Sequence, residues 1–202
     1  MYKQKSDKLK LEYTHRYSSP LGEITIASDG KALLGVWFDG QKYFGSTLAK
    51  THALEGANDA YLSEDSGIHM AKEEQKSLAI FQQTDKWLDI YFSGKAPDFT
   101  PLMHINTTAF RRAVWEILLT IPFGQTMTYG EVAKKIAKQR GVEKMSAQAV
   151  GGAVGHNPFS IIIPCHRVVG AKGELTGYGG GLDKKEWLLA MEEANYVYSS
   201  NL

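Results

Sequence analysis

The residue of this sequence best suited to covalent chemistry is its one cysteine, Cys165, which is followed directly by His166 and Arg167. A free thiol has a pKa of about 8.5, so only a few per cent is the nucleophilic thiolate at neutral pH, and activation requires a neighbouring base or positive charge. A lone cysteine is most often a small buried side chain. The histidine and arginine beside this one favour a nucleophile.

The residues before Cys165 are strongly apolar and must position it. Residues 160–163 read Ser-Ile-Ile-Ile, which predicts a buried strand, and Pro164 follows. On a regular strand, adjacent side chains point to opposite faces. We therefore expect His166 to reach the thiol only if the chain leaves β geometry at the proline.

The chain from 105 to 159 predicts helices. Apolar periodicity predicts a first helix over 108–119. Thr128 and Glu131 have the Thr-x-x-Glu spacing of a capping box, which predicts the start of a second helix. Ser146 is suited to cap a third. The last two helices, joined by a short polar turn, have the outline of a helix-turn-helix.

The third predicted helix contains three glycines, Gly151, Gly152 and Gly155. Each costs about 0.5–1 kcal/mol in a helix interior relative to alanine, so a face of small residues needs a reason. It permits close approach of another helix or of a nucleic-acid backbone, and the sequence leaves both open. The expected core face is Ala147, Val150 and Val154, and the expected opposite face is Ala149, Gly152, Ala153 and His156.

The first half of the chain predicts an α/β unit. Residues 12–40 alternate apolar and polar side chains around a turn at Asp29-Gly30, which predicts a β meander. Residues 41–66 are rich in loop formers, and the apolar pattern of residues 71–93 predicts a helix. The fold class is therefore mixed α/β, or α+β.

Composition excludes several classes of protein. With one cysteine in 202 residues, the chain forms no intramolecular disulfide and no cysteine-based zinc site. Its apolar runs are too short to span a bilayer, and residues 1–10 lack the apolar segment of a signal peptide. We expect a cytoplasmic protein without membrane contact, divided into domains at 1–104 and 105–202.

The net charge of +1 conceals a basic region. Residues 110–172 contain nine Lys or Arg against three Asp or Glu, a net charge of +6. Such an excess suits a phosphate backbone, but it is equally typical of a solvated surface. The candidates for phosphate contacts are Arg111, Lys134, Lys135, Lys138 and Arg140.

Several motifs occur together around the cysteine: Gly-His-Asn-Pro at 155–158, Pro-Cys-His-Arg-Val at 164–168, Gly-Tyr-Gly-Gly-Gly-Leu at 177–182 and Lys-Glu-Trp-Leu-Leu at 185–189. In order and spacing they closely resemble the methylated-DNA–protein-cysteine methyltransferases, which repair O6-alkylguanine. The resemblance covers about residues 105–196. It implies an N-terminal ribonuclease H-like α/β domain, then a mainly helical domain with a helix-turn-helix and the active cysteine.

The activity that this resemblance implies is direct DNA repair. The methyl group of O6-methylguanine would pass irreversibly to Cys165 in a single turnover, because the thioether product offers no acyl carbon for water to attack. The base would first leave the duplex. The implied partner is double-stranded DNA, bound through its minor groove by a monomer, with no cofactor and no metal. Acceptance of larger adducts or of O4-methylthymine is left open.

The resemblance also implies roles for single residues. His166 would accept the Cys165 proton through a water, Glu192 would orient that relay, and Asn157 would brace the turn. Tyr129 would form a hydrogen bond with guanine N3. The Gly179 N–H would form one with O6, and the carbonyls of Cys165 and Val168 would form hydrogen bonds with the exocyclic amine. The further substrate and DNA contacts would come from Gln148, Ala149, Gly152, Tyr178, Arg111, Lys134 and Lys135.

One position departs from the family pattern. Members of the family insert an arginine into the stack that the flipped base vacates, and the corresponding residue here is Gln148. Glutamine fills space and forms hydrogen bonds, but it carries no charge.

Two other functions compete with repair. A lesion sensor or DNA-binding regulator would use the same groove without chemistry, although relatives of that kind lack the reactive cysteine that Cys165 supplies. A thiol hydrolase or peroxidase would need a remote histidine in register. The candidates for that role are His15, His52, His69 and His104.

Overall fold

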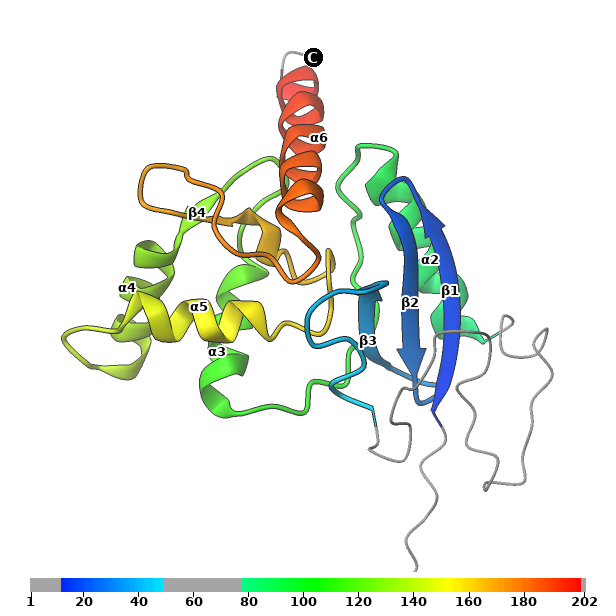
Figure 1. Cartoon of the computed structure of the whole chain (residues 1–202), viewed down its shortest axis with the longest axis horizontal. Helices are drawn as coiled ribbons and strands as arrows, with labels where there is room; N and C mark the ends of the chain where they lie inside the picture. Colours follow the sequence, from blue (N-terminus) through cyan, green and yellow to red (C-terminus); the bar gives the residue numbers. More distant parts are fainter. Residues whose placement is uncertain (1–11, 49–77, 201–202) are drawn as a thin grey trace, which may run out of the picture.

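The computed structural model, shown in Figure 1, places a small β sheet with one helix beside a group of four helices. It describes residues 12–48 and 78–200. The antiparallel sheet has the order β1-β2-β3. Mixed α/β composition is confirmed. The elements of this first part are β1 (Tyr13–Ser19), β2 (Gly22–Ser28), β3 (Leu33–Phe38) and α2 (Ala79–Phe92).

Tight turns connect the three strands, as the predicted meander requires. Gly22 and Gly30 have φ angles of +100° and +88°, in a region that favours glycine. Asp29 Oδ1 accepts hydrogen bonds from the backbone N–H groups of Lys31 and Ala32. The side chain thereby fixes the second turn, and the prediction of a β meander is confirmed.

Helix α2 packs on the sheet through the apolar stripe that the sequence predicts. Phe81 and Leu88 are fully buried, and so is Tyr91, which lies on the same face. The helix begins at Ala79, and the predicted residues 71–77 lie outside the described part of the chain.

The outer edge of β3 joins the sheet to the second half of the chain. Leu33 pairs with Met103, and Val36 pairs with Phe159. The Val36 N–H donates to the Pro158 carbonyl at 2.8 Å, and the Ser160 N–H donates to the Val36 carbonyl at 2.8 Å. The segment that leads to Cys165 is therefore anchored on the N-terminal sheet.

The second half holds the predicted helices. The side chains of Thr108, Thr128 and Ser146 each cap a helix by accepting a backbone N–H, and Thr128 with Glu131 forms the complete capping box. Helices α4 and α5 pack together with α3, which confirms the helix-turn-helix outline. The elements are α3 (Ala109–Leu118), β4 (Met127–Thr128), α4 (Tyr129–Arg140), α5 (Ala147–Gly155), η2 (Cys165–Arg167), β5 (Val168–Val169) and α6 (Leu182–Ser200).

The faces of α5 differ from the prediction at two positions. Ala147 is exposed, whereas Ala153 is buried with 3% of its surface accessible. Helix α3 packs on this side of α5, and the indole N–H of Trp115 donates to the Ala153 carbonyl at 2.9 Å. The core face is thus Val150, Ala153 and Val154.

The predicted strand at 160–163 is wrong, although its burial is right. All four residues are buried, but they form turns, with the Ile162 N–H bonded to the Ser160 carbonyl and the Ile163 N–H to the Phe159 carbonyl. Ile161 has a φ of +70°, which is incompatible with a strand and costs a residue of this type about 1–3 kcal/mol. The surrounding core holds this conformation.

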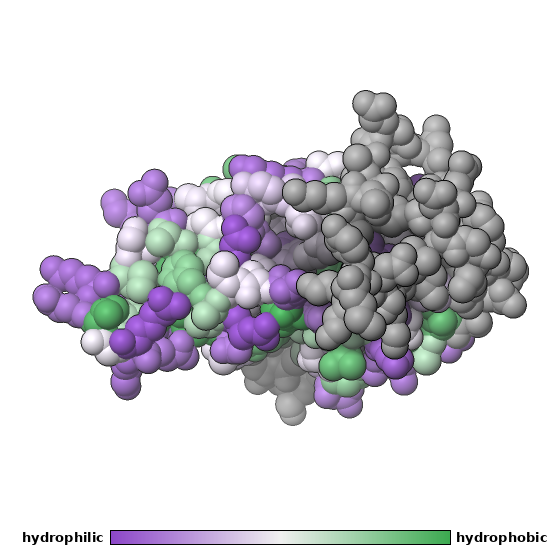
Figure 2. Space-filling model, turned by 90° about the horizontal axis from the view of Figure 1, so that it is seen from below, coloured by the Kyte–Doolittle hydropathy of each residue, from purple (hydrophilic) through white to green (hydrophobic). Residues whose placement is uncertain are grey.

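Figure 2 shows hydrophilic side chains at the outer edge of the helical half, around a paler and more apolar area. Lys134, Lys135 and Lys138 on α4, which are candidates for phosphate contacts, are exposed. In residues 12–48 and 78–200, no helix is both long enough and apolar enough to cross a membrane.

The capping box of α4 provides a test of this fold. Replacing Thr128 with Ala removes the side chain that accepts the Glu131 N–H and should lower the free energy of unfolding by about 1 kcal/mol. Urea unfolding followed by tryptophan fluorescence measures this change. The control is Thr126→Ala, because Thr126 is exposed. Its free energy of unfolding should change by no more than about 0.5 kcal/mol. Equal losses in the two variants would contradict the capping role.

Candidate active site

Cys165 is the first residue of η2, a single 3-10 turn that follows Pro164. The chain therefore leaves β geometry at the proline, as expected. After this turn, β5 pairs in parallel with β4, Met127 opposite Val168 and Thr128 opposite Val169. This pairing brings Tyr129, the first residue of α4, to the cysteine segment.

Asn157 holds the turns around Cys165. Its side-chain NH₂ donates to the Ile163 carbonyl at 2.8 Å and to Cys165 Sγ at 3.1 Å, and its Oδ1 accepts the Phe159 N–H at 2.9 Å. These contacts bind both ends of the 157–165 segment to one amide, which is itself buried. The bracing position implied for Asn157 agrees with this geometry.

The thiol of Cys165 is buried, with 6% of the residue accessible. Burial raises the pKa of the thiol, while the Asn157 N–H and the positive charge of Lys185 act in the opposite direction. Lys185 is itself buried and donates to the carbonyls of Val168 and Thr176 at 2.6 and 2.8 Å. Burial lowers the pKa of Lys185 to about 8. The resting cysteine is therefore a protonated thiol that needs a base.

A buried histidine and carboxylate lie beside this thiol. His166 Nε2 is 2.8 Å from Glu192 Oε1, and both residues are fully inaccessible. Burial lowers the pKa of His166, against the opposing effect of Glu192, so the ring is neutral at pH 7. Because a carboxylate only accepts, Nε2 carries the ring proton. Nδ1 has no hydrogen-bond partner in the described part of the chain, so its lone pair is available as a base.

Glu192 accepts hydrogen bonds from several segments at once. Arg167 Nε donates to Oε2 at 2.8 Å and Arg167 Nη2 to Oε1 at 3.0 Å, while the Gly124 N–H donates to Oε2 at 3.1 Å. The Tyr91 hydroxyl donates to Oε1 at 2.6 Å. The hydrogen bonds from His166 and Arg167, with the positive charge of Arg167, outweigh burial and lower the pKa of Glu192 to about 2. The carboxylate is therefore ionised in the core.

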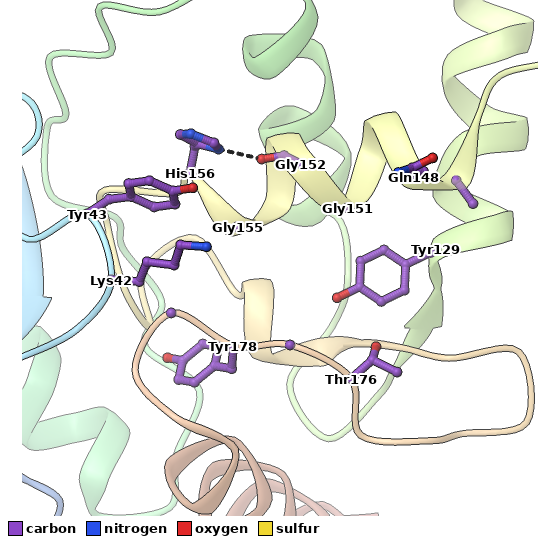
Figure 3. A pocket seen from close by; sticks show the side chains of 13 residues that line it. Lys42, Tyr43, Tyr129, Gln148, Gly151, Gly152, Gly155, His156, Thr176 and Tyr178 are labelled. Carbon is purple, nitrogen blue, oxygen red and sulfur yellow. Dashed lines mark hydrogen bonds between the residues drawn. The ribbon is translucent and has the colours of Figure 1, made fainter.

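A pocket of about 550 Å³ is lined in part by Tyr178, whose ring lies edge-on to His166 with centroids 6.4 Å apart (Figure 3). Cys165, His166 and Glu192 do not line it. Helix α5 forms one edge, the 176–179 loop faces it, and Lys42 and Tyr43 of the N-terminal half close one end. Gly152 and Gly155 line the pocket, and a Cβ atom on either would meet nothing within 4 Å. These two glycines of α5 are therefore open to a ligand, whereas Ala153 of the expected small face packs on α3.

The structure gathers some of the predicted contact residues in this pocket and leaves others outside it. Ala149 is exposed on α5 without lining the pocket, and Lys134 and Lys135 are exposed on α4. Arg111, on α3, is also outside it. The Val168 carbonyl already accepts the Lys185 ammonium. The predicted residues that line the pocket are Tyr129, Gln148, Gly152, Tyr178 and Gly179.

Sequence reasoning missed several residues of this site. Tyr91 lies on the α2 stripe with no chemical motif around it. Lys185 lies in the Lys-Glu-Trp-Leu-Leu motif, but the sequence predicts no role for it. Arg167 is predicted as a positive charge beside the thiol, but its bonds to Glu192 are not. Tyr43 stacks on His156 with ring centroids 4.1 Å apart, and the Lys42 N–H donates to the Gly179 carbonyl at 2.9 Å. No local signal in the sequence indicates these contacts across the two halves.

Metal ligation has no candidate in the described residues, where no three His, Cys, Asp or Glu side chains are grouped to hold an ion. The expectation that the protein uses neither metal nor cofactor stays a prediction.

Comparison with known proteins places this site in a family. The model of the 6-O-methylguanine DNA methyltransferase DNA-binding domain matches residues 109–194, and the model of the ribonuclease-like domain of the same proteins matches residues 13–103. A methylated-DNA–protein-cysteine methyltransferase of Haemophilus influenzae is 36% identical over 93% of this chain and 89% of its own length. The chain belongs to the 6-O-methylguanine DNA methyltransferase family. Its N-terminal half is thus the ribonuclease-like unit of that family, and the expected fold class is confirmed.

Other members of the family agree in sequence and in structure. A relative from Methanosarcina mazei with the same protein name is 36% identical over 91% of this chain and 98% of its own length. The crystal structure of Mycobacterium tuberculosis OGT in complex with DNA matches with a TM-score of 0.67 and 34% identity, covering 91% of this chain and 94% of that one. The exact domain boundary at 104/105 and the roles of single site residues stay predictions.

The buried carboxylate of Glu192 predicts a pH-dependent stability. Its pKa is about 2 in the folded protein against an ordinary value of 4.5, so the unfolded chain binds the proton first as the pH falls. Stabilisation of about 3 kcal/mol is therefore present above pH 4.5 and lost between pH 4.5 and 2. Urea unfolding at stepped pH should show a flatter dependence in Glu192→Gln than in the unsubstituted protein.

The matched control for this experiment is Glu193→Gln, because Glu193 is the next residue on α6 and is exposed. Its pH dependence should follow that of the unsubstituted protein. If Glu192→Gln also followed it, the carboxylate would not be the group that couples folding to protons in this range.

Proposed function

We propose that this protein repairs DNA by transferring the methyl group of O6-methylguanine to its own Cys165, irreversibly and once per molecule. The observation that carries the proposal is a buried thiol beside a neutral histidine, whose Nε2 proton is held by the ionised carboxylate of Glu192. Membership of the 6-O-methylguanine DNA methyltransferase family supports the same chemistry.

The proposed reaction is a displacement at the methyl carbon. His166 Nδ1 takes the Cys165 proton through a water, and Glu192 stabilises the imidazolium that results. The thiolate sulfur attacks the methyl carbon, so an S–C bond forms while the C–O6 bond breaks. The bonding electron pair stays with the guanine, which leaves as an anion unless a donor stabilises it. The product is a thioether on Cys165.

The pocket residues are suited to stabilise that leaving group. Tyr129 would donate to guanine N3, and burial raises the pKa of its hydroxyl, which keeps the proton in place. The Gly179 N–H would donate to O6, and the following peptide is held in place by the Lys42 N–H, which donates to the Gly179 carbonyl. The carbonyls of Cys165 and Val168 would accept the exocyclic amine, Val168 through its second lone pair because Lys185 occupies the first. Tyr129 and Tyr178 both line the pocket, and a thiolate at Cys165 would raise the pKa of both hydroxyls.

The proposed substrate is double-stranded DNA with the damaged base turned out of the helix. Helix α5 would enter the minor groove, where its glycine face admits the close approach of a nucleic-acid backbone. The exposed Arg and Lys residues of the basic region would contact phosphates, and Ala149 and Gly152 would lie against the groove. From the sequence we also propose that the protein acts as a cytoplasmic monomer.

The direct test is incubation with a duplex that contains O6-methylguanine. Peptide mass spectrometry should find one methyl group on Cys165 per protein molecule, and a second addition of substrate should transfer nothing more. Cys165→Ser should transfer none while still binding the duplex. Binding without transfer by the unsubstituted protein would support the lesion sensor, and repeated turnover would support a hydrolase or peroxidase.

Gln148 provides a second test, because it lines the pocket at the start of α5 where the family inserts an arginine. Gln148→Arg should speed repair of duplex substrate or tighten duplex binding by about tenfold, since it adds a charge close to the DNA. Single-turnover rates on duplex and on single-stranded substrate measure the effect. The control Gln139→Arg adds the same charge on α4 outside the pocket. An equal increase in rate or affinity in both variants would show that position 148 does not act at the vacated stack.

A further inference from the structure

Tyr91 reaches the candidate active site from the other half of the chain. It lies on α2 of the ribonuclease-like unit, 75 residues before His166 and 101 before Glu192. Its hydroxyl donates to Glu192 Oε1 at 2.6 Å and is 3.3 Å from His166 Nε2. Among the described residues that bond to this carboxylate, Tyr91 alone comes from the N-terminal half.

Packing holds the ring of Tyr91 with its hydroxyl directed at Glu192. The residue is fully buried, its ring stacks on Trp87 with centroids 5.4 Å apart, and Phe92 and Phe123 pack edge-on against it. Burial and the charge of Glu192 raise the pKa of Tyr91 well above its ordinary value. The hydroxyl therefore keeps its proton and acts as a fixed donor.

This donor discriminates between the two tautomers of His166. With its proton directed at Glu192 Oε1, the phenol oxygen turns a lone pair toward Nε2. An Nε2–H faces that lone pair and the carboxylate favourably, whereas a bare Nε2 would be repelled by both. In the alternative tautomer the proton is on Nδ1 and the lone pair is on Nε2, so Nδ1 cannot accept the cysteine proton.

We infer that Tyr91 is a positioning residue for alkyl transfer, which keeps Glu192 and the reactive tautomer of His166 in place from the N-terminal half. The inference rests on the proposed function. It assigns to the ribonuclease-like unit a direct part in preparing the base, in addition to anchoring the 158–160 segment on β3.

The experiment compares Tyr91→Phe with the matched control Thr84→Val. Both substitutions remove one buried hydroxyl from α2. The Thr84 hydroxyl donates to the Ile80 carbonyl of its own helix. Tyr91→Phe should lower the single-turnover rate of methyl transfer at saturating duplex by about tenfold, with the half-saturating DNA concentration unchanged. Thr84→Val should stay within about twofold of the unsubstituted protein in both.

A spectroscopic measurement separates positioning from general loss of structure. Nitrogen NMR of ¹⁵N-histidine protein should show the Nε2–H tautomer of His166 in the unsubstituted protein and in Thr84→Val, and a raised share of the Nδ1–H tautomer in Tyr91→Phe. If Tyr91→Phe is partly unfolded, the amplitude of the transfer reaction gives the folded fraction, and the rate of that fraction is compared.

The outcomes are distinct. If the unsubstituted protein leaves Cys165 without a methyl group, the proposed function itself fails. If Cys165 is methylated and Tyr91→Phe reacts within about twofold of the unsubstituted rate, the inference about Tyr91 is overturned. A slower rate with an unchanged tautomer overturns it as well, because the loss would then come from packing.

Discussion

The buried carboxylate of Glu192 is the interaction on which the rest of the site depends. An ionised group in a protein core is tolerated only when its charge is paired and its oxygens are hydrogen-bonded. Here the donors come from α2, the 124 turn and η2, so satisfying one charge fixes three segments relative to α6. Removing any one donor leaves the others to compensate for a charge that water does not reach. The same contacts that stabilise the core therefore orient His166.

The ribonuclease-like half contacts the site through several of its described elements. The edge of β3 carries residues 158–160, Tyr91 bonds to Glu192, and the Lys42-Tyr43 segment forms one end of the pocket. These contacts lie on different elements of the sheet unit. The position of the cysteine segment is therefore determined by both halves of the chain, and the pocket next to it is a product of their packing.

Local signals in the sequence predict much of this structure. The caps at Thr128 and Ser146 and the turn at Asp29-Gly30 appear where residue type and spacing place them. The conformation of the 160–163 segment is not predicted in this way, because an isoleucine run is equally compatible with a buried strand and with buried turns. The hydrogen bonds of Asn157 and the surrounding core determine that it forms turns. Contacts such as Tyr91 with Glu192 join residues that are distant in the sequence, so no local pattern carries them.

The electrostatics of the site separate stability from reactivity. Burial raises the pKa of Cys165 and lowers that of His166, so both side chains are neutral in the resting protein. A thiolate and an imidazolium would each be costly in this core, and a thiol that stays protonated reacts slowly with oxidants and other electrophiles. Proton transfer from Cys165 to His166 would form a thiolate–imidazolium pair, and it becomes favourable only when a bound substrate reacts with the thiolate. In the proposed single-turnover reaction the cysteine reacts once, so keeping the thiol protonated preserves it until the substrate is bound.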